Sequence, residues 1–159
     1  ARQLYFAFIF PHIKYGIECY GASSKNNIKK LQVIQHKLLK LIHRKDRLTP
    51  TNVIHKDTKI LKVCDIHRKY TSLFVWDCIN KETLEMFWTY FNNRETIHGH
   101  NTRNRNQIQI PRCKTNIAST SVKHQGSHIW NNIKETTRLS KSRNIFKRQL
   151  THDLLDSYN

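Results

Sequence analysis

Acidic residues are scarce in this chain of 159 residues, which has 11 Asp and Glu against 28 Lys and Arg and a formal net charge of +17. From Thr96 to Lys134 there is no carboxylate at all. Such an excess of one charge repels itself, so the composition predicts a polyanionic partner. The cations are also unevenly spread, because Gly21 to Leu48 holds eight cations and one anion, whereas Lys81 to His98 holds two cations and three anions. This placement favours a binding face over a uniformly charged surface.

Glycine and proline are also rare, with 4 and 3 residues, and the hydrophobic share of 38% is typical of a folded chain. The length allows one compact unit, which we divide into a helical thumb-like region at 1–95 and a basic carboxy-terminal region at 96–159. The four cysteines include no Cys-x-x-Cys pair, which excludes a dense disulfide framework and favours a reducing, intracellular compartment. No apolar run approaches the roughly 20 residues of a membrane helix, so no membrane partner is expected.

Helical periodicity covers most of the chain and predicts a mainly α fold. The first segment, Gln3 to Tyr20, is apolar on most faces, as in a buried helix, and Pro11 should break or kink it. A second helix is capped by Ser23 or Ser24 and has a basic opposite side. Its apolar residues lie three or four positions apart: Ile28, Leu31, Ile34, Leu38, Leu41 and Ile42.

Helices are also predicted downstream. One helix begins near Thr49 and Pro50. Further along, residues at helical spacing predict that the helix resumes, and the stripe that they form includes the charged residue Asp77. The last helix is capped by Ser140 or Ser142 and repeats apolar residues every four positions: Phe146, Leu150, Leu154 and Tyr158. We assign Trp130, Phe146 and Leu150 to the core. The alternation "QIQI" from Gln107 to Ile110 predicts a short β element in the second half of the chain.

Two basic segments are candidates for contact with phosphate. The second helix carries lysines that no acidic residue accompanies, so phosphate contact is favoured there over an ordinary solvated face. The stretch Ile97 to Thr115, "IHGHNTRNRNQIQIPRCKT", offers arginines and amides, which suit contact with a nucleic-acid backbone without base reading. Arginines that tie the loop to helix carbonyls are the alternative there. The candidate contacts are Lys29, Lys30, Lys37, Lys40, Arg103, Arg105, Arg112 and Lys114.

The patterns of a self-sufficient active site are missing. Two-metal polymerase chemistry needs paired carboxylates, and nucleophilic catalysis needs a positioned nucleophile and base, and neither pattern occurs. The ten histidines give three half-sites for a metal, each without the second half that structural zinc requires: Cys64-x-x-His67, His98-x-His100 and His124-x-x-x-His128. We therefore expect no catalytic residue and no metal site, with a metal-dependent nuclease as an alternative that metal analysis would test.

Five segments resemble, in their order and spacing, the region that follows the reverse transcriptase palm in LINE-type non-LTR retrotransposon polyproteins of the jockey kind. They are "LYFAFIFPHIKYGIECYG" at Leu4 to Gly21, "LQVIQHKLLKLI" at Leu31 to Ile42, "ILKVCDI" at Ile60 to Ile66, "HNTRN" with "IPRCKTN", and "GSHIWNNI" followed by "FKRQL".

The resemblance implies the thumb and carboxy-terminal region of an RNA-directed DNA polymerase, a helical bundle that grips the backbone of a template-primer duplex of RNA and DNA. It also implies an upstream palm and fingers as partners, magnesium in that palm, no cofactor in this chain, and a nuclear location. The catalytic aspartates of a palm are absent from this chain, so we expect no polymerisation by it alone. The alternative is a non-catalytic helical structural or protein-interaction module, such as a degenerate element remnant.

Overall fold

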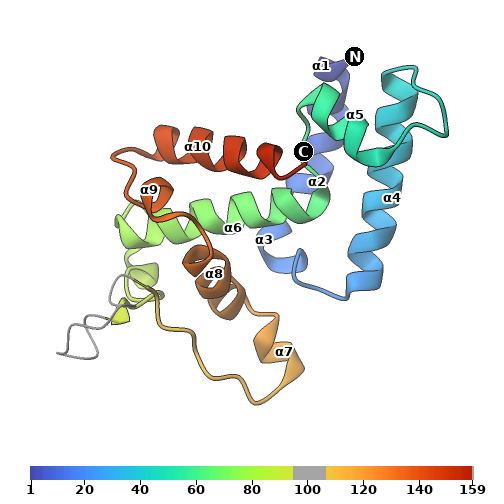
Figure 1. Ribbon diagram of the computed structural model, residues 1–159. Coiled ribbons are helices and arrows are strands. Elements are labelled where there is room, and N and C mark those ends of the chain that lie inside the picture. The colour runs from blue at the N-terminus through green and yellow to red at the C-terminus, as the bar shows by residue number, and fades with distance from the viewer. Residues whose placement is uncertain (95–106, 159) are drawn as a thin grey trace. The chain divides into compact units, whose positions relative to one another are not determined.

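The computed structural model of the chain describes residues 1–94 and 107–158, and these are mainly α-helical, as predicted (Figure 1). In chain order the elements are α1 (Arg2–Leu4), the π-helix η1 (Tyr5–Ile9), α2 (Phe10–Lys14), α3 (Ile17–Tyr20), α4 (Lys25–Ile42), α5 (Thr51–Thr58), α6 (Val63–Ile79), the 3₁₀-helix η2 (Glu85–Phe87), α7 (Asn116–Ser119), α8 (Val122–Asn131), α9 (Glu135–Arg138) and α10 (Arg143–Asp156).

The chain forms two compact units. Unit 1 comprises Ala1–Arg68 and Thr151–Asn159, and unit 2 comprises Lys69–Leu150. The division that the sequence predicts, between residues 95 and 96, lies outside the described residues.

The first segment is helical, but it is not one buried helix. Pro11 has no N–H to donate to the carbonyl four residues earlier, and its ring would clash there in an ideal helix. The chain accommodates Pro11 with the wider π turn of η1 directly before it, and Gly16, at φ 64°, separates α2 from α3. The prediction that this segment is buried on most faces is wrong, because Tyr5 is buried but Phe8 is 69% exposed.

Helix α4 begins after Ser24, as predicted, but its buried side differs from the predicted one. The side chains of Gln35 and Leu39 are buried, whereas Ile34 and Leu41, predicted to face the core, are 52% and 75% exposed. Leu39 packs in a cluster with three other buried residues: Tyr5, Ile54 and Ile60. The helix is turned in this way because Gln35 has hydrogen-bond partners inside unit 1, which make the burial of its amide possible.

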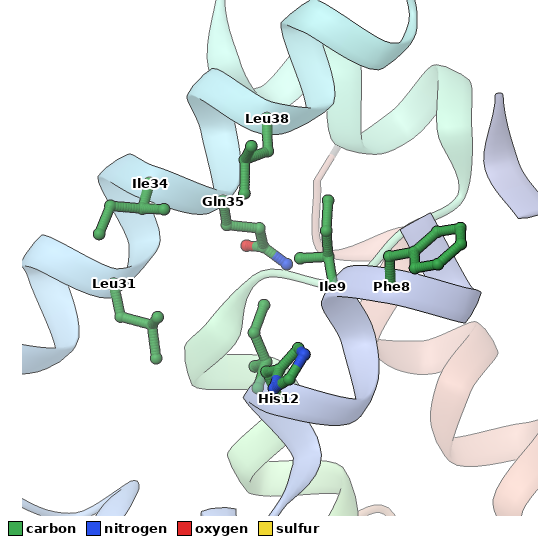
Figure 2. A pocket seen from close by; sticks show the side chains of 8 residues that line it. Phe8, Ile9, His12, Leu31, Ile34, Gln35 and Leu38 are labelled. Atoms are coloured by element: carbon green, nitrogen blue, oxygen red, sulfur yellow. The ribbon is translucent and has the colours of Figure 1, made fainter. Parts of the chain in front are cut away.

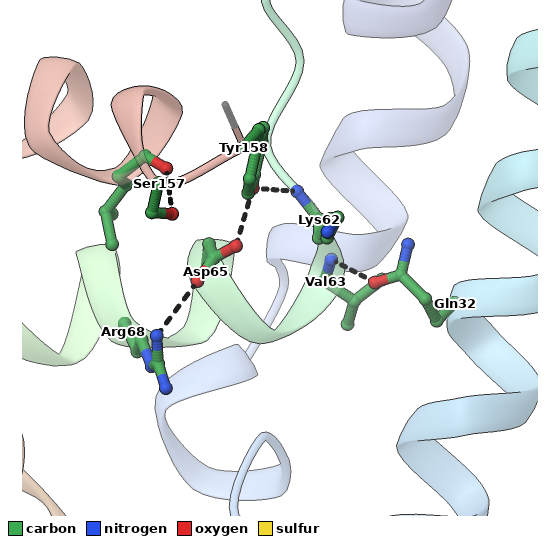
Figure 3. Close-up of polar contacts among 8 residues, drawn as sticks. Gln32, Lys62, Val63, Asp65, Arg68, Ser157 and Tyr158 are labelled. Atoms are coloured by element: carbon green, nitrogen blue, oxygen red, sulfur yellow. Dashed lines mark hydrogen bonds and ion pairs between the residues drawn. The ribbon is translucent and has the colours of Figure 1, made fainter. Parts of the chain in front are cut away.

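Side chains that are distant in sequence cap the start of α6 (Figure 3). The backbone N–H of Lys62 donates to the hydroxyl of Tyr158 at 3.0 Å, and the N–H of Val63 donates to Oε1 of Gln32 at 2.7 Å. Tyr158 in turn donates to a carboxylate oxygen of Asp65 at 2.5 Å. These bonds satisfy N–H groups that a helix leaves without partners at its start, and they join three segments of unit 1.

The core of unit 2 is aromatic, and it confirms the assignment of Trp130, Phe146 and Leu150 to the interior. The ring of Phe146 is stacked on Trp76, with centroids 6.3 Å apart, and lies 5.6 Å from the ring of Trp130. Asp77, the charged residue of the apolar stripe, forms two hydrogen bonds with the guanidinium of Arg143, at 2.6 and 2.9 Å. Asp77 therefore lies on the stripe that meets α10 because an arginine pairs with it there.

Helix α8 contains a glycine because its surroundings leave no room for a side chain. A Cβ atom at Gly126 would lie 3.0 Å from the ring of Phe91 and 3.1 Å from Val75. The close approach of these side chains to the helix backbone explains why glycine occupies this position, although glycine within a helix lowers its stability.

The prediction of a strand from Gln107 to Ile110 is wrong, since the described residues there form only an isolated antiparallel bridge between Ile108 and Asn93. Instead of a second strand, the side chain of Asn131 pairs with the backbone. Its amide oxygen accepts from the N–H of Ile108 and its amide nitrogen donates to the carbonyl of Ile108, both at 2.9 Å. The alternating pattern thus reflects one inward-facing isoleucine held by α8.

Candidate nucleic-acid interface

Helix α4 presents lysines to solvent, as the sequence predicts. Lys29, Lys30 and Lys37 are exposed, and none forms an ion pair with an acidic residue in the described part of the chain. Lys30 and Lys37 are seven residues apart, which is about two helical turns, so both lie on one side of the helix. Their charges are therefore available for an anionic ligand.

Lys40, the fourth predicted lysine of α4, has a structural contact. Its ammonium group donates to the backbone carbonyl of Arg47 at 2.7 Å, and the side chain is half-buried. This bond closes the turn after α4. The ammonium of Lys45, in the same turn, lies 3.3 Å from a carboxylate oxygen of Asp57. Lys40 is thus less available for phosphate than the other three lysines.

The opposite side of α4 is fixed by glutamines. Nε2 of Gln35 donates to the hydroxyl of Tyr5 at 2.8 Å and to the carbonyl of Leu61 at 2.9 Å, and Oε1 of Gln35 accepts from Nε2 of Gln32 at 2.7 Å. Burial raises the pKa of Tyr5 to about 12, so Tyr5 keeps its proton. This network turns the Gln35 side of α4 toward the interior of unit 1, so the lysines lie on the outside.

His36 of α4 meets His55 of α5. The rings of His36 and His55 have centroids 5.0 Å apart, and Nδ1 of His55 donates to the carbonyl of Ile60 at 2.7 Å. Burial, followed by the nearby His55, Lys62 and Lys40, lowers the pKa of His36 to about 4. Burial also lowers the pKa of His55. Both rings are therefore neutral near pH 7 and add no charge to the basic face.

The predicted contacts in the second half of the chain fall into two groups. Arg112 and Lys114 are exposed in unit 2, in the irregular segment before α7, and form no ion pair within the described ranges. Arg103 and Arg105 lie outside the described residues. The lysines of α4 belong to unit 1, so the predicted contacts are distributed over both units.

One cation of unit 2 stands out in the structure but not in the sequence. Burial, followed by the charge of Lys147, lowers the pKa of Lys69 to about 8. A lysine in this state would be stabilised by an anion beside it. The sequence gives no signal for it, because Lys69 and Lys147 are far apart in the chain.

The half-sites that lie in the described residues gain no further metal-binding side chain from the fold. The rings of His124 and His128, one turn apart on α8, have centroids 4.6 Å apart. No group of three or more His, Cys, Asp or Glu side chains that could hold a metal ion occurs in residues 1–94 and 107–158. His98 and His100 lie outside these ranges, so the expectation of no metal site stays a prediction. No helix in the described part of the chain is long and apolar enough to span a bilayer.

Comparison with known proteins gives one relative for part of the chain. A Drosophila melanogaster protein described as "Probable RNA-directed DNA polymerase from transposon X-element" is 30% identical over 71 residues. Part of this chain is thus similar to part of a transposon RNA-directed DNA polymerase. The matched stretch is 45% of this chain and 8% of the relative. No family model matches the chain, and no solved structure matches it. The similarity supports the class of polymerase that the five sequence segments indicate.

Proposed function

We propose that this chain is the thumb and carboxy-terminal region of an RNA-directed DNA polymerase of a mobile element, and that it holds a template-primer duplex of RNA and DNA. The observation that carries the proposal is the exposed side of α4, where Lys29, Lys30 and Lys37 have no acidic partner among the described residues. The similarity to a transposon polymerase supports the class of protein.

The proposed contact does not depend on base sequence. Lysine and arginine side chains neutralise phosphates and release the counterions condensed on them, so affinity depends on salt concentration. Lys40, Arg103, Arg105, Arg112 and Lys114 complete the proposed set of contacts. The chain would position the duplex, while the chemistry and any magnesium would belong to carboxylates of an upstream palm. Primer extension by residues 1–159 alone is therefore not expected.

The test is a salt series with a labelled RNA–DNA hybrid. Each neutralised phosphate lowers log affinity by about 0.7 to 0.9 per unit of log salt. The triple variant Lys29→Gln, Lys30→Gln, Lys37→Gln should therefore reduce the slope by about two to three units. Lys45→Gln is the matched control, because its ammonium already pairs with Asp57.

A second variant tests the other basic segment. Replacing Arg103, Arg105, Arg112 and Lys114 with glutamine should flatten the salt slope by about three units while circular dichroism stays unchanged. A variant that unfolds and keeps its slope would show that these cations clamp the loop. A wild-type chain that is folded but does not bind the hybrid at low salt would support the alternative, a non-catalytic interaction module.

A further inference from the structure

An apolar pocket of about 280 Å³ lies in unit 1 between the first helical segment and α4 (Figure 2). One wall is formed by Phe8, Ile9 and His12, and the other by three residues of α4: Leu31, Ile34 and Leu38. The volume lies just below the range of about 300–1,000 Å³ that is usual for small-molecule sites. It suits a few apolar side chains of a larger ligand.

The apolar surface continues beyond the pocket. Phe8 and Ile34, on opposite walls, are more than half exposed, and so is Leu41, two turns after Ile34 on the same side of α4. Leu4, four residues before Phe8, is exposed as well. Exposed apolar residues beside a hollow are typical of a protein-binding site.

Of the eight residues that line the pocket, six are apolar, and the two polar ones are Gln35 and the exposed His12. Gln35 lies in the wall, but its amide nitrogen donates to Tyr5 and Leu61, and its amide oxygen accepts from Gln32. A nucleotide base has polar edges that would lose their hydrogen bonds there. An aliphatic or aromatic side chain loses none, so the pocket favours a protein ligand over a base.

The charges beside the pocket favour an acidic ligand. Lys30 and Lys37 lie four residues before and three residues after Ile34, so they border its exposed side. Residues 1–68 carry 14 Lys and Arg and four Asp and Glu, so docking of a second copy through this face would bring like charges together.

We propose that this pocket and its rim bind an amphipathic helix of a protein partner, with apolar residues three or four apart and carboxylates beside them. The apolar side chains enter the pocket between Phe8 and Ile34, and the carboxylates pair with Lys30 and Lys37. Such a helix in a groove is a common mode of peptide recognition. The proposal shares Lys30 and Lys37 with the proposed duplex contacts, and the apolar wall residues distinguish the two, because a duplex backbone has no use for them.

The test is selection of displayed helical peptides on the chain of residues 1–159. The groove variant is Phe8→Ser with Ile34→Ser, and the matched control is Ile117→Ser with Leu139→Ser, two exposed apolar residues of unit 2. Peptides enriched on the wild type should combine apolar residues at helical spacing with Asp or Glu. They should bind the groove variant about tenfold more weakly and the control variant as well as the wild type.

Three outcomes would overturn the proposal. In the first, no peptide is enriched, or enriched peptides are basic or bind the groove variant as well as the wild type. In the second, the groove variant loses affinity for the RNA–DNA hybrid, which would make the groove a nucleic-acid site. In the third, the wild type dimerises in sedimentation and the groove variant does not, which would make the ligand a second copy. Circular dichroism verifies that both variants are folded. Loss of peptide binding with unchanged hybrid binding supports the proposal, whatever the outcome of the lysine variants.

Discussion

Tyr158 donates its hydroxyl hydrogen to Asp65, a residue 93 positions earlier, and accepts a hydrogen bond from the backbone of Lys62. The ammonium of Lys62 also lies 4.5 Å from the centre of the Tyr158 ring. The phenol therefore joins the end of the chain to the start of α6 through a carboxylate, a backbone N–H and a cation. Burial and the bond with Asp65 raise the pKa of Tyr158, so the hydroxyl stays protonated as a donor.

Removal of this hydroxyl should destabilise unit 1. Tyr158→Phe keeps the ring but leaves the part-buried N–H of Lys62 without its acceptor and Oδ2 of Asp65 without its donor. We expect the free energy of unfolding to fall by about 1–3 kcal/mol, measured by urea denaturation. Ser157→Ala, at an exposed neighbouring residue, is the control and should change it by less than about 0.5 kcal/mol. Equal effects of both variants would contradict the role of the hydroxyl.

The second prediction concerns acid sensitivity. The pKa of His36 is lowered to about 4 in the fold and that of His55 is also lowered, whereas an unfolded histidine titrates near 6.5. Below pH 6.5 the unfolded chain binds more protons than the folded one, so stability should fall as the pH falls through this window toward 4. His36→Gln should make this decline shallower. Urea unfolding at a series of pH values measures it, and a stability that does not change on acidification would refute the assignment.

The third prediction concerns the side-chain clamp of unit 2. Asn131→Ala removes both partners of the buried backbone of Ile108, so we expect a loss of about 2–3 kcal/mol in unfolding free energy. Asn132→Ala, the exposed neighbour, is the matched control and should cost little. If the two variants were equally stable, Ile108 would not depend on the clamp.

The fourth prediction concerns the end of α5. Lys59 has a left-handed backbone conformation, with φ 53°, which costs a residue other than glycine about 1 kcal/mol. Lys59→Gly should therefore raise the midpoint of urea unfolding, and Lys59→Ala, which removes the same side chain but keeps a Cβ, should not. An equal gain from alanine would point to the lysine charge as the cause.

The sequence predicts helices well where apolar spacing and caps agree. Helix α4 begins directly after Ser24, although the hydroxyl of Ser24 caps no backbone N–H. At α10 the hydroxyl of the predicted Ser142 accepts from the N–H of Ile145 at 3.4 Å. The rotation of α4 was not predictable in this way, because hydrophobic spacing treats Gln35 as a surface residue. Its burial depends on Tyr5 and Leu61, which are 30 and 26 positions away.

The candidate site is predictable to a similar extent. Lys29, Lys30 and Lys37 are exposed and form no ion pair with an acidic residue within the described residues, and their contact with nucleic acid stays a prediction. The bond between Lys40 and the carbonyl of Arg47 has no sequence signal, because any residue can supply a backbone carbonyl. The apolar pocket could not be predicted from the sequence either, because Phe8 and Ile34 are apolar residues of the kind that usually lie in a core.

The π turn of η1 makes the first segment sensitive to the insertion or deletion of a single residue. A π turn contains one residue more than an α turn, so everything before it is rotated by about 100° relative to an uninterrupted α-helix. Within η1 itself Tyr5 is buried, whereas Phe8 is 69% exposed. Loss of one residue between Tyr5 and Pro11 would rotate the preceding residues by about 100° around the helix axis, although the composition of the segment would hardly change. In this part of the chain an insertion or deletion would therefore alter the protein more than most substitutions.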